Sequence, residues 1–426
     1  MDISRRVFLS SVGALALPAA AAPSDRLNIG FIGVGARAHQ LVDELMRIDR
    51  AEIVAVCDAY KGRLTRAVER TEGRAKIAAD HRAILDDDSI DAVVVASPDH
   101  WHADHCIEAL KAGKHVYCEK PLTYTADEGL AIAKAVKKSG KKLQVGSQGV
   151  SSDLQRQAKD MIANGKLGDV TMIRANYNRN SASGAWIYPI PPDASEETVD
   201  WEMFLGPAPK RPFSLERFFR WRCYEDYSGG IATDLFVHLC TTIHELMGVG
   251  APAQVMAMGD LYRWRESREV PDTLNAILRY KEGFTVTLGS TFNNGTGGTG
   301  FEFLGTEGSL AIGSRNMTFE RQLVRENNDW IVASWPTELA EPFSQQEAAA
   351  RPSLRDRPEP EEFREKGRST TYKHLERFVN AVLNDEEIIE DAAAGHHAAA
   401  CAHMVNLSAR TGRTVLWGFE KDTIAT

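Results

Sequence analysis

The chain has 426 residues, of which 43% are hydrophobic and 26% are charged, and its formal net charge is −9. This length exceeds the roughly 100–200 residues of a typical domain and therefore predicts two domains. No segment approaches the roughly 20 uninterrupted apolar residues of a transmembrane helix, and a negative chain without a basic patch would repel a nucleic-acid backbone, so we expect no membrane span and no nucleic-acid partner.

The first 22 residues differ in character from the rest of the chain. Arg5 and Arg6 precede Val7-Phe8-Leu9 and a modest apolar run, and Pro18 and an alanine tract follow. This order resembles a twin-arginine signal peptide, in which small residues mark the cleavage site. We therefore expect residues 1–22 to be a removable leader and the mature protein to be periplasmic. A frayed, partly helical N-terminus is the alternative.

Apolar strands and amphipathic helices alternate over residues 25–148, an order that builds a parallel sheet covered on both faces. Helices are expected at 102–111 and 126–138. The expected strands are Leu27–Ile32, Ile53–Cys57, Ala92–Ala96, His115–Cys118 and Leu143–Val145. The pattern predicts an α/β fold whose N-terminal part is a doubly wound Rossmann domain.

Residues 149–426 have a different pattern, with consecutive strands rather than strict alternation. The expected strands are 170–177, 254–258, 274–280 and 284–290, the last two forming a hairpin. The expected helices are 154–164, 231–247, 371–383 and 392–410, and the polar stretch 338–369 is expected to be a surface loop or arm. This predicts an α+β domain with a mainly antiparallel sheet, for substrate binding and for assembly into a homodimer or homotetramer.

The first expected strand leads into Gly33-Val34-Gly35-Ala36-Arg37-Ala38, a G-x-G-x-x-A sequence before a helical pattern. Gly33 permits a tight turn, Gly35 lets the backbone approach a pyrophosphate, and the helix N-terminus favours negative charge. Asp58 follows 25 residues after Gly33, where a carboxylate can accept hydrogen bonds from a ribose. NAD is expected because Asp58 would repel a 2′-phosphate. NADP stays open because of three nearby basic residues, Arg37, Lys61 and Arg63.

Two further motifs follow neighbouring strands, Ser97-Pro98-Asp99-His100-Trp101-His102 and Cys118-Glu119-Lys120-Pro121. The carboxyl ends of parallel strands are where open α/β sheets bind ligands. With the glycine loop, Asp58 and a later Asp234-x-x-x-His238, the chain resembles the glucose-fructose oxidoreductase, inositol dehydrogenase and rhizopine-catabolism (Gfo/Idh/MocA) family. The resemblance implies an NAD(P)-dependent oxidoreductase acting on CH–OH groups. It also implies cofactor contacts from five residues, Ser97, Pro98, His102, Glu119 and Lys120.

Dehydrogenation of an alcohol needs a group that takes the hydroxyl proton while hydride leaves for nicotinamide. Lys120 can take it if burial near the cationic nicotinamide leaves its amine partly neutral, and the resemblance gives it contact with the reacting hydroxyl. Asp234 and His238 are four residues apart in an expected helix and so lie on one face. The resemblance implies that His238 is an acid/base partner or substrate ligand and that Asp234 orients substrate. A purely structural Asp–His pair is the alternative.

Arg222 and Tyr224, before that helix, and Asn176, on the first strand of the second domain, are expected to bind substrate hydroxyl groups, with simple packing as the alternative. No metal site is expected, because His244 lies about 240° around the helix from His238 and no compact ligand set accompanies it. The segment 146–150 lacks the asparagine and arginines that many relatives carry, which leaves substrate contacts at the domain junction open.

Export would separate the enzyme from the cytoplasmic systems that regenerate NAD. We therefore expect a tightly bound cofactor, and the resemblance implies a sugar or polyol substrate. The second hypothesis is a glycoside-cleaving enzyme that oxidises the sugar ring transiently, although known hydrolases of the superfamily usually lack the Glu119-Lys120-Pro121 motif. The third is a sugar or cofactor binder without catalysis, in which Lys120 and His238 would be idle.

Overall fold

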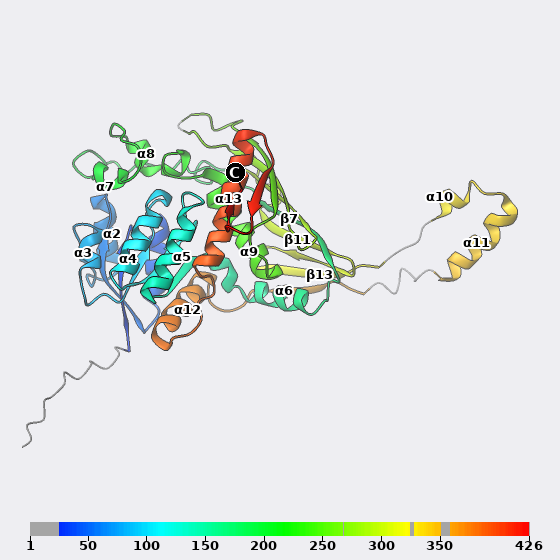
Figure 1. Ribbon diagram of the computed structural model, residues 1–426, viewed down its shortest axis with the longest axis horizontal. Coiled ribbons are helices and arrows are strands. Elements are labelled where there is room, and N and C mark those ends of the chain that lie inside the picture. Colours follow the sequence, from blue (N-terminus) through cyan, green and yellow to red (C-terminus); the bar gives the residue numbers. More distant parts are fainter. Residues whose placement is uncertain (1–24, 267, 324–327, 351–357, 426) are drawn as a thin grey trace, which may run out of the picture.

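The computed structural model describes residues 25–266, 268–323, 328–350 and 358–425. The expected leader lies outside the described residues. Figure 1 shows the helices of the first domain (α2 to α5) on one side and the large sheet of the second domain (β7, β11, β13) on the other, with α9 and α13 between them.

The first domain is built on six parallel strands in the order β3-β2-β1-β4-β5-β6. This is the doubly wound order in which ligands bind beside the switch between the first and fourth strands. All four side chains of β4 are buried apolar residues, as expected for a strand covered on both faces. The strands are β1 Leu27–Ile32, β2 Ala51–Cys57, β3 Lys76–Ile77, β4 Ala92–Val95, β5 His115–Glu119 and β6 Leu143–Gly146. The predicted Rossmann sheet is confirmed.

Five α-helices and two short 3-10 turns accompany this sheet. They are α1 Ala36–Leu45, α2 Lys61–Arg70, α3 His81–Leu85, η1 Asp99–Trp101, α4 His102–Lys111, α5 Glu128–Ser139 and η2 Gln148–Ser151. Helix α12 (Thr370–Asn384), from near the C-terminus, returns to this domain. Its Leu375 and Phe378 join the apolar cluster formed by Leu41 and Leu45 of α1. The segment 149–426 is therefore not packed as one continuous second domain, because this late helix completes the first core.

The second domain contains a ten-stranded sheet in the order β14-β13-β12-β11-β7-β10-β9-β8-β15-β16. Only β7 and β10 pair in parallel among these described strands, which confirms the predicted, mainly antiparallel sheet. The strands are β7 Val170–Tyr177, β8 Gln254–Asp260, β9 Thr273–Arg279, β10 Thr285–Thr291, β11 Thr299–Gly305, β12 Gly308–Ile312, β13 Asn316–Arg321, β14 Glu361–Arg364, β15 Val415–Gly418 and β16 Thr423–Ile424.

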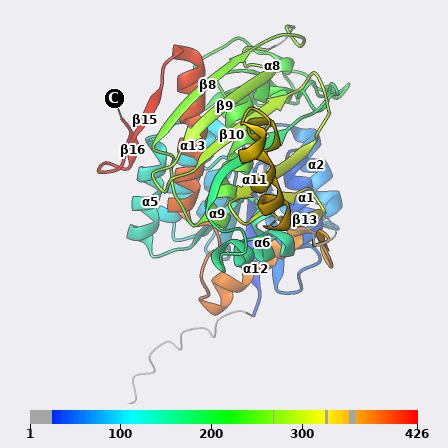
Figure 2. The same ribbon diagram turned by 90° about the vertical axis from the view of Figure 1, so that its right-hand side faces the viewer.

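Three long helices accompany this sheet, α6 Asp153–Ala163, α9 Val237–Met247 and α13 Ala392–Thr411. Along β9 buried and exposed side chains alternate, as expected for a sheet that is covered on one face. The other face exposes large apolar side chains, which are Met172, Met256, Met258 and Ile277. Figure 2 turns this sheet toward the viewer, with β8, β9 and β10 side by side.

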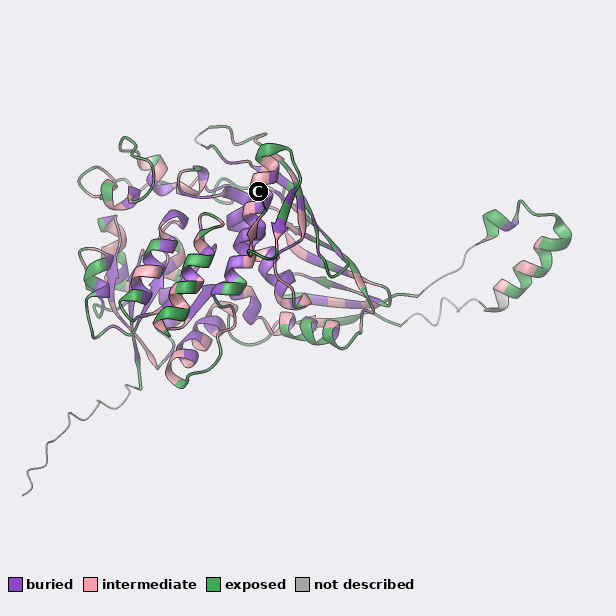
Figure 3. Ribbon diagram, in the orientation of Figure 1, coloured by how far each residue is buried: buried purple, intermediate pink, exposed green. Residues whose placement is uncertain are grey.

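The segment 338–369 was expected to be a surface loop or arm, and its described part is an exposed arm that contains regular structure. Helix α11 (Thr337–Ala350) follows α10 (Asp329–Val332), and β14 pairs with β13. Alanine, glutamate and glutamine, which are abundant in α11, favour helix even in a polar segment, and for this reason polarity alone was misleading. In Figure 3 these two helices are coloured mostly as exposed and stand apart from the two domains.

Between β7 and α9 the chain forms short helices rather than strands. They are α7 Trp201–Leu205, α8 Leu215–Phe219, the 3-10 turn η3 Trp221–Cys223 and the π-helical turn η4 Ala232–Phe236, which runs directly into α9. In Figure 1, α7 and α8 lie over the end of the first domain where α2, α3 and α4 are labelled. Within the described part of the chain, no helix is long and apolar enough to cross a membrane.

Candidate active site

A cavity of about 1050 Å³ lies where the two domains meet. Its volume is at the upper end of the roughly 300–1,000 Å³ usual for small-molecule sites. Its walls include most of the residues predicted for the site: Gly33, Gly35, Ala36, Arg37, Asp58, Ser97, Pro98, His102, Glu119, Lys120, Arg222, Asp234 and His238. Residues from Gly33 to His238, far apart in the sequence, therefore face one space.

The turn after β1 has the geometry that a dinucleotide requires. Gly33 has a positive φ of 85°, and a Cβ at this position would lie 2.8 Å from the backbone nitrogen of Ser97. Helix α1 then begins without a side-chain cap and without an acidic residue in its first turn. Its first N–H groups are thus open to a negatively charged ligand, which suits a pyrophosphate.

Asp58 fastens this turn from the end of β2. Its Oδ2 accepts a hydrogen bond from the Val34 amide (2.8 Å), and its Oδ1 accepts one from the Tyr60 amide (2.9 Å). Nη1 of Arg63 lies 3.5 Å from the same Oδ1. Each carboxylate oxygen can accept a further hydrogen bond, so Asp58 remains able to receive a ribose hydroxyl. The residues present therefore fit the adenosine half of NAD.

Glu119 links the cofactor turn to the Lys120 segment. Its Oε1 accepts hydrogen bonds from Nε of Arg37 (3.0 Å) and from Nε2 of Gln148 (2.7 Å). Burial disfavours the charged form of Arg37, but the neighbouring Glu119 outweighs it and the pKa of Arg37 lies above its ordinary value. Gln148 belongs to the segment 146–150, and it supports Glu119 from the domain junction.

Lys120, Asp234 and Arg222 form a buried charge cluster in the cavity wall. Nζ of Lys120 donates to the backbone oxygen (2.8 Å) and to Oδ1 (2.9 Å) of Asp234, and Nε of Arg222 donates to the same Oδ1 (2.9 Å). Burial would raise the pKa of Asp234, but the two cations outweigh it and hold that pKa well below its ordinary value. Asp234 is therefore a permanent anion that binds two positive side chains.

His238 lies one helical turn beyond Asp234 and also lines the cavity. Among the described residues its ring has no hydrogen-bonding partner, and its nearest aromatic neighbour is Tyr177, with ring centroids 6.2 Å apart. Burial, aided by the positive charge of Lys120, holds the pKa of His238 well below its ordinary value. The imidazole is consequently neutral near pH 7 and can accept a proton from a ligand in the cavity.

His102 was predicted as a cofactor ligand, and its ring lines the cavity between two backbone oxygens. Nδ1 lies 2.6 Å from the backbone oxygen of Pro121, Nε2 lies 2.9 Å from that of Ser97, and the residue is only 1% exposed. Burial lowers the pKa of His102, and a neutral imidazole has one N–H, so the ring donates to only one of these oxygens while it lines the cavity and joins the loops after β4 and β5. Ser97 and Pro98 remain at the cavity surface.

Two of the predicted substrate ligands lie away from the cavity. The side-chain amide of Asn176 donates to the backbone oxygens of Gly297 and Gly298, and Tyr224 is buried with the Arg217 guanidinium 4.2 Å from its ring centre. Neither residue is part of the cavity wall.

The cavity instead receives Tyr177 and Arg179, which the sequence analysis missed. Side chains alternate between the two faces of a strand. Asn176 therefore lies on the face of β7 that contacts the loop at Gly297 and Gly298, and its neighbour Tyr177 lies on the face that lines the cavity. Trp221, which adjoins Arg222 in the sequence, also lines this wall. Tyr188 and Trp186 complete it, and their only sequence signal was an aromatic-rich segment.

His244 is buried and its Nε2 lies 2.9 Å from the hydroxyl of Tyr280. In the part of the chain that the structure describes, no group of three or more His, Cys, Asp or Glu side chains is arranged to hold a metal ion.

Comparison with known protein families gives two matches along the chain. Residues 27–147 match the oxidoreductase family with an NAD-binding Rossmann fold (Gfo/Idh/MocA), and residues 155–311 match the C-terminal domain of the same family. The chain belongs to this family. The match confirms the predicted NAD-binding domain and the predicted pairing of that domain with a second, mainly antiparallel one.

Curated relatives match over about a third of the chain. Inositol 2-dehydrogenase of Salmonella typhimurium is 30% identical over 158 residues, which is 36% of this chain and 47% of that protein. A glycosyl hydrolase family 109 protein of Shewanella baltica is 28% identical over 161 residues, 36% of this chain and 35% of that protein. The chain thus spans about half the length of the inositol dehydrogenases it matches.

Solved structures match over both domains. Levoglucosan dehydrogenase, in complex with NADH and levoglucosan, superposes with a TM-score of 0.69 at 21% identity, covering 92% of this chain and 99% of that one. A dehydrogenase described as a putative myo-inositol dehydrogenase from Sinorhizobium meliloti superposes with a TM-score of 0.64 at 20% identity, covering 92% and 99%. At these identities the likeness establishes the fold.

Proposed function

We propose that this protein is an exported NAD-dependent oxidoreductase that transfers hydride between a retained nicotinamide cofactor and a hydroxyl group of a sugar or polyol. The observation that carries the proposal is one cavity in which the glycine turn at Gly33 shares its walls with Lys120, Asp234 and His238. A dinucleotide-binding turn and a proton-accepting side chain are the two parts that alcohol dehydrogenation needs. NAD is favoured over NADP because Asp58 would oppose a 2′-phosphate, although Arg63 beside it reduces that effect.

When bound, NAD⁺ supplies the hydride-accepting C4 atom of its nicotinamide ring. The ammonium of Lys120 uses two of its three N–H donors on Asp234, which leaves one to donate to the oxygen of a substrate hydroxyl. That donation stabilises negative charge on the oxygen as the hydroxyl proton leaves.

Proton acceptance is better assigned to His238 than to Lys120. Loss of a proton from Lys120 would break its ion pair with Asp234, whereas the neutral ring of His238 has an unengaged lone pair in the cavity. Arg222 and Arg179, with the faces of Trp221 and Tyr188, offer donors and flat apolar surfaces to a hydroxylated ring. This supports a sugar or polyol as the substrate. Inositol and levoglucosan are the first compounds to test, because similar proteins are named as dehydrogenases of these compounds.

The Lys120→Ala variant tests the role of the cluster. We expect turnover to fall at least about a hundredfold while the nicotinamide released on denaturation stays at the wild-type amount. Lys159→Ala is the control, because Lys159 lies outside the cavity wall and its Nζ pairs with Glu245 on the surface of the second domain. A fully active Lys120→Ala protein would refute the assignment.

A glycoside-cleaving reaction is the second candidate, and the matches to glycosyl hydrolase family 109 proteins favour it. The protein would then oxidise a ring hydroxyl, eliminate the aglycone and return the hydride, so that no net redox change results. Product analysis with a glycoside separates the candidates. Net ketone formation supports dehydrogenation, and release of an aglycone without net cofactor reduction supports cleavage.

Export through the twin-arginine pathway is part of the proposal and rests on Arg5 and Arg6 before the apolar run. The double variant Arg5→Lys/Arg6→Lys should leave the full-length protein in the cytoplasm, whereas the wild-type protein should be recovered from the periplasm without residues 1–22. Equal distribution of the two proteins would contradict the proposal.

We also propose that subunits associate as a homodimer or homotetramer through the exposed sheet face that contains Met256, Met258 and Ile277. The Met258→Asp variant should lower the mass measured by light scattering to that of a monomer.

A further inference from the structure

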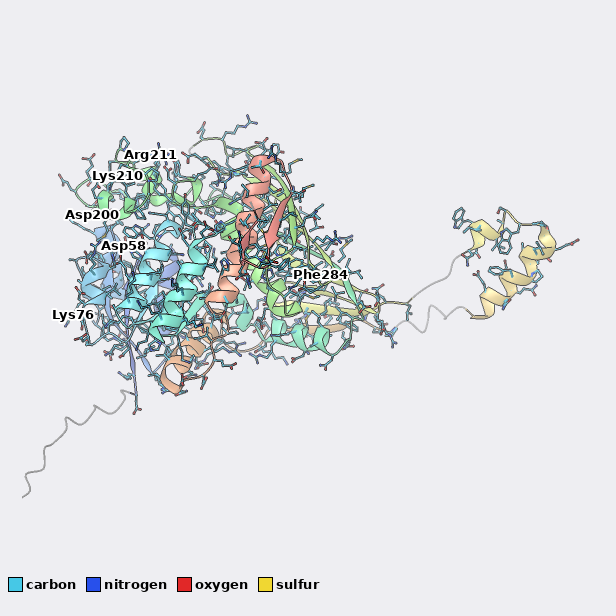
Figure 4. The ribbon with its side chains drawn as sticks, in the orientation of Figure 1. Asp58, Lys76, Asp200, Lys210, Arg211 and Phe284 are labelled. Atoms are coloured by element: carbon cyan, nitrogen blue, oxygen red, sulfur yellow. The ribbon has the colours of Figure 1, made fainter. Side chains whose placement is uncertain are left out.

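At the adenosine end of the cavity, part of the wall comes from the second domain. Residues 193–219, here called the clasp, cross over the loop that follows β2 and contribute Met203, Phe204, Phe218 and Phe219 to the cavity wall. Figure 4 shows Asp58 of the first domain and Asp200 of the clasp at the same end of the molecule, with Lys210 and Arg211 further along the clasp.

Backbone hydrogen bonds fasten the clasp to the first domain. The amide of Asp200 donates to the oxygen of Ala59 (2.7 Å) and the amide of Lys61 donates to the oxygen of Thr198 (3.0 Å), which makes Tyr60 and Val199 partners in a short antiparallel bridge. This pairing is an isolated antiparallel β-bridge between the two domains, and it lies two residues after Asp58 in the sequence.

Side chains reinforce the bridge. The Tyr60 hydroxyl donates to Oδ1 of Asp193 (2.6 Å), and Nζ of Lys61 donates to the backbone oxygen of Glu197 (2.8 Å). Further along, Nε1 of Trp101 donates to the backbone oxygen of Phe204 (3.0 Å). The clasp is thus attached at two separate points of the first domain, after β2 and after β4.

The clasp also reaches the charged groups of the adenosine end. The guanidinium of Arg63 lies 5.0 Å from the ring centre of Phe218 and 5.3 Å from that of Phe219, within cation–π distance. The same guanidinium is 3.5 Å from Asp58. The position of Arg63 beside the ribose-binding carboxylate therefore depends on aromatic rings supplied by the other domain.

A second hollow of about 680 Å³ lies on the other side of this bridge. It shares Asp58, Ala59 and Asp200 with the main cavity, and Lys61 and Val199 also line it. Opening the bridge would join the two hollows and expose the adenosine end of the cofactor site.

We infer that the clasp retains the dinucleotide, so that NAD is a resident group of this protein and is not exchanged at each turnover. This inference rests on the proposed function, because it presupposes that NAD binds in the main cavity. Release requires that the hydrogen bonds between residues 59–61 and 198–200 break. The NADH formed in each turnover then has to be reoxidised within the site, by passing its hydride to a second, reducible substrate such as another sugar or a ketone.

The test measures exchange of bound, isotopically labelled NAD⁺ against an excess of unlabelled NAD⁺, which does not depend on turnover. Tyr60→Phe removes only the hydroxyl that donates to Asp193 and should accelerate exchange about tenfold, since hydrogen bonds to charged groups are strong. Tyr124→Phe is the matched control. Its hydroxyl donates to the backbone oxygen of Glu225, also across the domains, but outside the cavity wall, and exchange should stay at the wild-type rate.

A second pair of variants isolates the backbone bridge. Asp200→Ala and Asp200→Pro both lose the side-chain oxygen that caps α7, but only the proline also loses the N–H that donates to Ala59. The φ of −79° at this position is compatible with proline. We expect Asp200→Pro to exchange NAD at least about tenfold faster than Asp200→Ala.

Three results are informative. Wild-type exchange over hours, with acceleration in Tyr60→Phe and Asp200→Pro only, supports retention by the clasp. Binding of NAD with wild-type exchange within seconds, or equal rates in all variants, overturns the inference and leaves the proposed function standing. Failure of the wild-type protein to bind any NAD refutes the proposed function itself.

Discussion

The Lys120 end and the Asp58 end of the cavity are held together in different ways. At the Lys120 end, charged side chains bind one another: Asp234 pairs with Lys120 and with Arg222. At the Asp58 end, backbone amides and carbonyls make most of the contacts, both in the turn at Gly33 and in the bridge between Tyr60 and Val199. The difference teaches that proton transfer and cofactor retention reside in separate parts of one cavity and should be separable by mutation.

The Asp234→Asn variant should have the largest effect at the Lys120 end. Removing one partner of a buried ion pair typically costs about 3–5 kcal/mol, because the remaining charges are unpaired. Since Arg222 is partly exposed, we expect the free energy of unfolding to fall by an amount near the lower limit of this range. Turnover should fall at least about a hundredfold. Urea unfolding and steady-state kinetics measure the two effects. The control is Glu361→Gln, which breaks an exposed ion pair with Lys166 and should change neither stability nor turnover. A stable, active Asp234→Asn protein would contradict the account.

The Gly33→Ala variant tests the Asp58 end. Its Cβ would lie 2.8 Å from the backbone nitrogen of Ser97 at a positive φ, and the turn would have to shift. We expect the NAD content of the purified protein to fall at least about tenfold. Gly283→Ala is the control. Gly283 also has a positive φ, but no atom lies within 4 Å of the position that an alanine methyl group would take there. The substitution therefore strains the backbone without a steric clash. Full NAD content in Gly33→Ala would show that the turn does not hold the cofactor.

The pH dependence of the reaction reports on His238. Burial and the charge of Lys120 lower its pKa, and a general base must be neutral to act, so activity should be lost only as the pH falls through this lowered pKa. The acid limb of kcat/KM for alcohol oxidation should therefore lie clearly below 6.5, the ordinary value for histidine. NAD content should stay constant over the same range. A limb above 6.5 would argue against His238 as the base.

The smallest effects are expected at the two residues that lie away from the cavity. Asn176→Ser and Tyr224→Phe should change the KM for the sugar by less than about twofold, because neither side chain lines the cavity wall. Arg179→Gln should raise that KM about tenfold by removing a cationic donor from the wall. The opposite ranking would show that the substrate enters from the other face of β7.

The sequence allowed the fold and the centre of the site to be predicted because their signals are local. Continuous apolar runs such as Ala92–Val95 identified buried strands, and the spacing of Asp234 and His238 placed both on one helical face. Tyr177 was missed because the alternation along β7 shows which residues share a face but not which face meets the ligand, and Arg179 lies beyond the end of that strand.

Other features depend on contacts that no local pattern records. The ring of His102 lies between the backbone oxygens of Ser97 and Pro121, which only the folded loops bring together. Tyr60 and Val199 are remote in sequence, and neither stands in a strand-like segment that would predict their pairing. The clasp, and with it the separation between the two ends of the cavity, could be found only in the structure.

A single-turnover measurement tests the central claim most directly. The protein as purified, without added cofactor, is mixed with an oxidisable sugar or polyol, and the absorbance of reduced nicotinamide is followed. Wild-type protein should give one equivalent of reduced nicotinamide per cofactor bound. His238→Asn should contain as much cofactor but react at least about a hundredfold more slowly. Reduction in His238→Asn at the wild-type rate would contradict the account.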